Sequence, residues 1–462
     1  MRGNHPGHEN SRAREGAEYT SLTTVGHMIV EPMRLLFFLF GCGALWGQPT
    51  YDLLLKGGHV IDPKNRINDA RDVAIKDGRI AAVAASIPAT QARKTVQVTG
   101  LYIVPGLIDI HAHVFSGTNG HMLAGGDSSI HPDSFAQRVG VTTVVDAGSS
   151  GRVNFAEFRR TIVDRARTRV LVFLNINGLG MPGDDKEQNL NDMDARAAAD
   201  LAIANKDVIV GIKVAHYRGP DWTPVERGVQ AGSIANIPVM VDFGDFRPER
   251  PFQDLVLKKL RPGDIYTHAF YAPVPYFDEN GRLLPYLREA RKRGVLFDVG
   301  HGGAAFEFKV AGPALMQDFP PDTISTDVHA GSLNAGMKDM LDVMSKFLNL
   351  GMPVDDVIYR STWNAARVIK REDLGHLSVG AAADIAVLRV EQGDFGFVDS
   401  WGAGMRGTRR FLNELTLRDG LVIYDSNGRT RESWDKLGNY KPQGESWWDG
   451  TRSSGRLRNR RK

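Results

Sequence analysis

The stretch PGLIDIHAHVF, residues 105–115, places two histidines directly after an apolar run. Residues 107–110 are typical of a buried strand, and residues i and i+2 of a strand face the same way. His111 and His113 therefore point together where the strand ends. Two converging neutral imidazoles are what a divalent metal ion needs. Taken alone, the pair is equally compatible with a chance occurrence in a turn, so the rest of the chain has to decide.

Apolar runs alternate with stretches of helical composition from this point onward. Eight such runs occur in order, and they read GLIDIHAH, VTTVVDAG, RVLVFLNIN, VIVGIKVAH, IPVMVDFG, DIYTHAF, GVLFDVGH and TISTDVH. Alternation of strands and helices predicts a parallel sheet. Eight units predict an α/β chain built on a (β/α)8 TIM barrel.

Each of the eight runs ends in a polar or ionisable residue. These residues are His111 and His113, Asp146, Asn175, Lys213 and His216, Asp242, His268, His301, and Asp327. Chance would scatter such residues along the strands and around the outer loops. Because (β/α)8 barrels place their chemistry at the C-terminal ends of their strands, this alignment predicts one site at the barrel mouth.

Similar hairpin signals occur on both sides of the predicted barrel. Asp77-Gly78 and Asp419-Gly420 each separate two short apolar runs, which is typical of a two-residue β-turn. We therefore expect a small β-sandwich domain built from residues 51–104 and 371–425, around a barrel of residues 105–370. Residues 426–462 form a basic tail that is expected to be disordered and solvated rather than a nucleic-acid arm.

The N-terminal part of the chain is typical of a targeting segment. Residues 1–47 combine a polar extension with a stretch that starts at Met33, carries Arg34 and continues as an apolar run of signal-peptide length. This run is too short for a stable membrane span. Residues 39–42 also form an imperfect lipobox, so Cys42, the single cysteine of the chain, is a candidate for lipid attachment. We expect an exported protein, periplasmic or secreted, and cleavage at or after Cys42.

The ordered motifs VIDP, KDGRI, PGLIDIHAH, GVTTVVDAGS, GIKV, RPGDIYTH, FDVGHG and STDVH resemble the amidohydrolase superfamily. More narrowly, the chain resembles the dihydroorotase-like amidohydrolase/deacetylase branch from about residue 51 to residue 425. The resemblance implies two divalent metal ions, usually Zn²⁺. It assigns His111 and His113 to one metal, an N6-carboxylated Lys213 to a bridge between the two, and His268 to the second. Asp327 would complete the first.

Two positions depart from the pattern of that branch. Asp242 stands on the fifth run where the family usually has histidine. A carboxylate can bind zinc through oxygen, so Asp242 is expected to be a ligand, and the alternative is a group that orients His268. Phe115 stands where dihydroorotases usually carry an arginine that holds a substrate carboxylate, which argues against dihydroorotate as the substrate.

The predicted activity is hydrolysis of an amide, such as an N-acyl amino acid or a cyclic amide, or of a related acyl ester. A metal-bound hydroxide would attack the carbonyl carbon, and Asp327 would act as general acid and base. His301 is expected to bind substrate, and the alternative is that it holds its loop in place. His216 is expected to support the metal ligands without contacting a metal ion itself. The other function class is a catalytically inactive member that serves as a binding or assembly protein. The expected partner is a small-molecule substrate, and no nucleic acid is expected. Association with further copies of the chain stays open.

Overall fold

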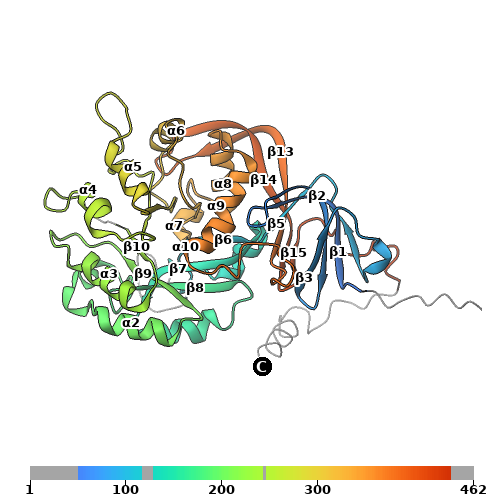
Figure 1. Ribbon diagram of the computed structural model, residues 1–462, viewed down its shortest axis with the longest axis horizontal. Coiled ribbons are helices and arrows are strands. Elements are labelled where there is room, and N and C mark those ends of the chain that lie inside the picture. The colour runs from blue at the N-terminus through green and yellow to red at the C-terminus, as the bar shows by residue number, and fades with distance from the viewer. Residues whose placement is uncertain (1–49, 117–127, 243–245, 439–462) are drawn as a thin grey trace, which may run out of the picture. The chain divides into compact units, whose positions relative to one another are not determined.

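The computed structural model describes residues 50–116, 128–242 and 246–438. Within them the fold is mixed α/β, and one of its two sheets is parallel (Figure 1). This sheet has the order β12-β11-β10-β9-β8-β7-β6. Its strands are β6 (Leu107–Ala112), β7 (Val141–Gly151), β8 (Arg169–Asn175), β9 (Ile209–Val214), β10 (Val239–Val241), β11 (Ile265–Tyr266) and β12 (Leu296–Phe297). Seven of the eight predicted runs thus contain a strand of this sheet.

The eighth predicted run, TISTDVH, is attached to both edges of the parallel sheet without forming a regular strand. Isolated parallel bridges join Val328 to Ala112 of β6 and Thr323 to Asp298, the residue after β12. The Asp327 N–H also donates to the carbonyl oxygen of His111 at 2.7 Å. The sheet is therefore curled, and residues 323–328 connect its first strand to its last.

The helices follow the strands along the chain. They are α1 (Phe155–Phe158), α2 (Ala195–Ala204), α3 (Thr223–Ala235), α4 (Phe252–Asp254), α5 (Pro285–Lys292), α6 (Phe308–Met316), α7 (Ala330–Leu333), α8 (Met340–Asn349), α9 (Val354–Ser361) and α10 (Trp363–Val368). Helices α2 and α3 pack against β8, β9 and β10, as Figure 1 shows. Inside the curl, apolar side chains such as Ile110, Phe173 and Met240 form one buried cluster with α10. This packed apolar cluster supports the strands whose C-terminal ends carry the predicted site residues.

The second sheet is mostly antiparallel. It combines strands that precede the parallel sheet in the sequence with strands that follow it. Its order is β15-β14-β13-β5-β1-β2-β3, with β4 on β1. The strands are β1 (Leu53–Asp62), β2 (Ile67–Lys76), β3 (Arg79–Ala84), β4 (Thr95–Gln97), β5 (Tyr102–Pro105), β13 (Ile385–Val398), β14 (Gly404–Arg418) and β15 (Leu421–Asp425).

Both predicted hairpin turns are confirmed. Asp77 and Gly78 connect β2 to β3 with φ of 49° and 76°, and Asp419 and Gly420 connect β14 to β15 with φ of 48° and 73°. Positive φ at both central residues is the type I′ geometry, which matches the twist of the flanking strands.

Among the described residues, no helix is long and apolar enough to cross a membrane. The predicted targeting segment, residues 1–47, lies outside the described residues, as does the predicted basic tail from residue 439 onward. Residues 426–438 of that tail are described, and there the N–H groups of Arg429 and Thr430 donate to the Asp425 carboxylate. The expectations about these two segments stay predictions.

Candidate active site

Three of the predicted ligands converge where β6 and the segment 323–328 meet. His113 Nε2 lies 3.0 Å from Asp327 Oδ1, and His111 Nε2 lies 3.5 Å from the same oxygen. His268, which follows β11, completes a group in which one ligand atom each of His111, His268 and Asp327 lies within 4.8 Å of the others. The structure thus brings together side chains that lie up to 216 residues apart (111 to 327) in the sequence.

Hydrogen bonds behind the histidines fix the direction of their rings. Thr267 Oγ1 donates to Asp298 Oδ2 at 2.8 Å, so the contact of 2.8 Å between His111 Nδ1 and Thr267 Oγ1 has the imidazole as donor. His268 Nδ1 likewise donates to the carbonyl oxygen of Gly300 at 2.6 Å. With Nδ1 protonated, a neutral ring presents a lone pair at Nε2.

These lone pairs face carboxylate oxygens, which also carry lone pairs. His268 Nε2 lies 3.3 Å from Asp242 Oδ2, in the same way that His111 Nε2 faces Asp327. Two lone pairs at this separation repel, so a positive species stabilises each pair, which can be a proton, a metal ion or, at His111, the nearby Lys213 amine. Burial lowers the pKa of His111 to about 3, which disfavours a proton on that ring and leaves the neutral form that a metal ion requires.

Lys213 reaches this group from the end of β9. Its side chain is fully buried, and its Nζ lies 3.1 Å from His111 Nε2. Burial lowers the pKa of the Lys213 amine, which favours its neutral form. Gly148, with φ of +92°, makes room for the lysine stem, because a Cβ there would lie 2.6 Å from Lys213 Cγ.

Asp242 lies on the Nε2 side of His268. The Nδ1 atom of His268 is already bound to Gly300, so Asp242 approaches the other nitrogen, Nε2. A residue that oriented His268 from behind would contact Nδ1 instead. His216 approaches the same Asp242 oxygen, with Nε2 at 3.2 Å. Although burial opposes it, the carboxylates of Asp242 and Glu187 raise the pKa of His216 to about 10 when no metal is present.

His301 is placed differently from the other predicted site residues. Its side chain is fully buried, Nδ1 donates to the carbonyl oxygen of Gly302 at 2.9 Å, and Nε2 accepts from Lys346 Nζ at 2.8 Å. The ring is also stacked on Phe306 at a centroid distance of 4.5 Å. Both nitrogens therefore have protein partners, an arrangement that fits the loop-fixing alternative better than direct substrate contact. A role in substrate binding stays a prediction.

The backbone is strained at three of the side chains that converge here. His216, His268 and Asp327 have φ of 55°, 62° and 51°. Non-glycine residues rarely adopt such left-handed conformations, and these cluster at functional sites. The side chains at these positions contact residues of neighbouring strand ends: His216 and His268 contact Asp242, and Asp327 contacts His111.

Comparison with known proteins places the chain in a family. A model of the amidohydrolase family matches residues 311–404. A deacetylase of Brucella anthropi is 36% identical over 344 residues, which is 73% of this chain and 83% of that protein. A deacetylase of Enterococcus faecalis is 31% identical over 390 residues, which covers 81% of this chain and 100% of the relative. The chain belongs to the amidohydrolase superfamily.

Within this superfamily it falls in the dihydroorotase-like branch. A crystal structure of a dihydroorotase aligns with a TM-score of 0.69 at 31% identity, over 81% of this chain and 99% of that one. A crystal structure of an adenine deaminase aligns with a TM-score of 0.74 at 29% identity, over 81% and 100%. The protein is accordingly a metal-dependent amidohydrolase that acts on C–N bonds other than peptide bonds. This favours the enzyme over the alternative of a non-catalytic binding protein.

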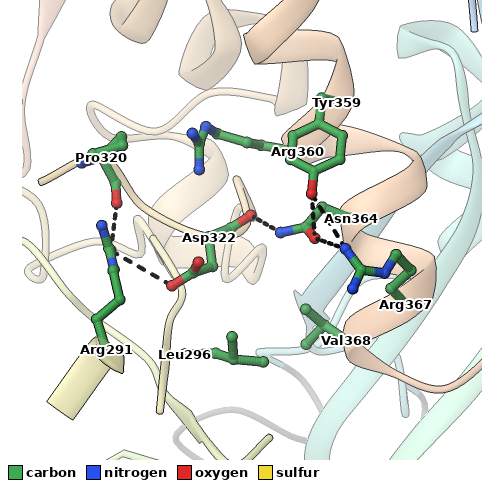
Figure 2. A pocket seen from close by; sticks show the side chains of 9 residues that line it. All are labelled: Arg291, Leu296, Pro320, Asp322, Tyr359, Arg360, Asn364, Arg367 and Val368. Carbon is green, nitrogen blue, oxygen red and sulfur yellow. Dashed lines mark hydrogen bonds and ion pairs between the residues drawn. The ribbon is translucent and has the colours of Figure 1, made fainter. Parts of the chain in front are cut away.

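A cavity of about 430 Å³ is lined by nine residues, none of which is a predicted ligand of this amidohydrolase (Figure 2). Its lining includes Leu296, the first residue of β12, and Asp322, which precedes the segment 323–328. The predicted ligands occupy the opposite, C-terminal ends of the strands. Figure 2 shows that Asn364 donates to the carbonyl oxygen of Asp322 and accepts from Tyr359.

Several supporting residues were missed by sequence reasoning. Thr267 and Ser149, which hydrogen-bond to His111 and His113, lie within quoted motifs, so their position after a strand was a usable signal. Glu187, which contacts His216 Nδ1 at 2.8 Å, lies in a short 3-10 helix, Asp184–Gln188, that follows β8 and carries no comparable signal.

Proposed function

We propose that the protein hydrolyses the amide bond of an N-acyl amino acid or a related small acyl compound at the site formed by His111, His113 and Asp327. The observation that carries the proposal is the approach of both histidines to one oxygen of Asp327, at 3.5 and 3.0 Å. Further proposed ligands of two divalent ions, with Zn²⁺ the first candidate, are Lys213 in its carboxylated form, Asp242 and His268.

The residues present fit such a metal centre. His111 and His268 donate from Nδ1 to protein oxygens and turn Nε2 toward carboxylates, which is the usual arrangement of ligating histidines. A divalent metal ion bound there would lower the pKa of a bound water and polarise the substrate carbonyl. Burial of Lys213 favours the neutral amine, the form that adds carbon dioxide to give a carbamate.

Asp327 is proposed to move the proton in this reaction. Its Oδ1 faces the two histidines, and the left-handed backbone at this residue turns its carboxylate into the site. We assign to Asp327 the acceptance of a proton from the attacking water and its delivery to the leaving nitrogen or oxygen. The bond between the acyl carbon and the leaving atom breaks, and an acid and an amine or alcohol are released.

The substrate class rests on the relatives and on one core residue. Three relatives are named deacetylases, which favours an open-chain N-acyl group over a cyclic amide. Phe115 is fully buried and packs against Phe158 at a centroid distance of 4.7 Å, so it does not supply a group that would hold the carboxylate of dihydroorotate.

The test combines metal analysis with a substrate screen. Purified protein is expected to contain one to two divalent ions per chain and to hydrolyse at least one compound among N-acetyl-D-amino acids, dipeptides and acyl esters. Chelation should abolish the activity, and added Zn²⁺ should restore it. Protein produced with zinc that contains essentially no metal would contradict the proposal.

Two further features are proposed on the same basis. The bridges of Thr323 and Val328 to opposite edges of the parallel sheet support an eight-membered closed barrel. The apolar run after Arg34 supports export, with a mature chain that starts at or just after residues 42–47. Intact-mass measurement of the active protein tests export, and retention of residues 1–47 would reject it.

A further inference from the structure

His216 lies between two carboxylates at the end of β9. Its Nδ1 lies 2.8 Å from Glu187 Oε2, and its Nε2 lies 3.2 Å from Asp242 Oδ2. The Glu187 side chain is 4% exposed, so its charge is held inside the protein. The same Asp242 oxygen lies 3.3 Å from His268 Nε2. One carboxylate oxygen therefore faces two imidazole nitrogens that come from different strand ends.

These contacts repeat the pattern of the predicted ligands. A carboxylate behind one ring nitrogen, with the other nitrogen turned toward a shared point, is the usual environment of a metal-binding histidine. Zinc binds nitrogen and oxygen at about 2.0–2.2 Å, and in a tetrahedral site two such donors are about 3.3–3.5 Å apart. The separations of 3.2 and 3.3 Å around Asp242 Oδ2 are close to that value.

The number of imidazole donors in this half of the site also supports His216 as a ligand. With Asp242 at a position where histidine was expected, His268 alone would supply an imidazole there. His216 is 3 residues beyond Lys213, and its φ of 55° turns it back across the strand ends toward Asp242. It is thus positioned to contribute the missing nitrogen from a neighbouring strand.

We propose that His216 is a ligand of the second divalent ion through Nε2, together with Asp242 and His268, and that Glu187 holds its ring. This inference rests on the proposed metal centre. The competing arrangement is a permanent ion pair, in which a protonated His216 is fixed between Glu187 and Asp242 and takes no part in metal binding.

The two arrangements differ in metal stoichiometry. Stripped protein is titrated with Co²⁺, and bound metal is measured by mass spectrometry and by the visible absorption of the ion. His216→Ala is expected to bind one ion fewer than the wild type, and added imidazole should restore part of the lost metal and absorption. Glu187→Gln, which keeps a hydrogen-bonding side chain, should weaken the second ion about 10–100-fold.

His131→Ala is the matched control. His131 is not among the proposed ligands, and its Nδ1 accepts from the Asp133 N–H at the start of a short helix, Pro132–Ser134. It should bind as much metal as the wild type. Wild-type stoichiometry and an unchanged Co²⁺ spectrum in both His216→Ala and Glu187→Gln would overturn the assignment of His216 alone. A wild type that binds no ion would instead overturn the proposed function. If His216→Ala does not fold, Glu187→Gln decides by its affinity.

Discussion

Lys213 Nζ lies 3.1 Å from His111 Nε2, and each of these two residues is at most 1% exposed to solvent. Because Nδ1 of His111 donates to Thr267, its Nε2 is the acceptor in this contact and the lysine is the donor. A charged ammonium is costly in such a place, and burial lowers the pKa of the amine. Burial thus disfavours the charged form of Lys213, whereas the carboxylates of Asp242 and Asp327 act in the opposite direction on its pKa.

The space around Lys213 gives a first prediction. In Gly148→Ala the new Cβ would lie 2.6 Å from Lys213 Cγ, so the lysine has to move and metal content should fall. Gly263→Ala is the matched control, because Gly263 has a similar φ of +87° but nothing within 4 Å of the added Cβ. Both variants should lose about 1–2 kcal/mol of unfolding free energy through backbone strain. Equal metal content in the two would show that Lys213 needs no room here.

Asp327→Asn tests the proposed proton carrier. The amide keeps the size of the side chain and one oxygen, but it does not accept a proton at neutral pH. The expected result is a fall in kcat of about 10²–10⁴-fold. Rates are measured with excess Zn²⁺ so that a loss of metal affinity is not mistaken for a loss of proton transfer. A kcat within a few-fold of the wild type under these conditions would remove Asp327 from the role of general acid and base.

The buried Lys346 predicts a pH dependence of stability. Burial lowers its pKa from 10.5 to about 8, despite its ion pair with Asp342 at 3.1 Å. Between pH 8 and 10.5 the unfolded chain therefore binds more protons at Lys346 than the folded chain does. The contribution of this group to the unfolding free energy rises with pH across that window. One pKa unit corresponds to about 1.4 kcal/mol, so the contribution amounts to a few kcal/mol.

This dependence is measured by urea unfolding at several pH values in wild type and Lys346→Met. The wild type should gain stability relative to the variant as the pH rises from 8 toward 10. Parallel stability curves would show that Lys346 has an ordinary pKa. The same variant tests whether the Lys346 contact with His301 matters for turnover, since it removes the donor to His301 Nε2.

Part of the fold and the site could be predicted because local rules govern it. Strand ends carry i and i+2 side chains to one side, which is why His111 and His113 could be paired from the sequence alone. The turns at Asp77 and Asp419 were predictable for a similar reason, since the residue after each is a glycine that tolerates positive φ.

Other parts depend on contacts between distant segments. The interaction of Glu187 with His216 spans 29 residues, and that of Lys346 with His301 spans 45. Neither pair follows the helical or strand periodicity from which a contact could be predicted in the sequence. His216 was expected behind the ligands because it lies three residues beyond Lys213, and its left-handed φ of 55° and its contact with Asp242 could not be foreseen from that spacing.

Metal content and turnover of Lys213→Ala, with and without an added short carboxylic acid, test the central claim most directly. If Lys213 is the carboxylated bridge, the variant should lose metal, and its rate should fall about 10³-fold or more, which equals about 4 kcal/mol of barrier. A short-chain acid should then restore part of both the metal and the rate by replacing the carbamate. Full metal content with near-normal turnover in the variant, and no effect of the acid, would contradict the account.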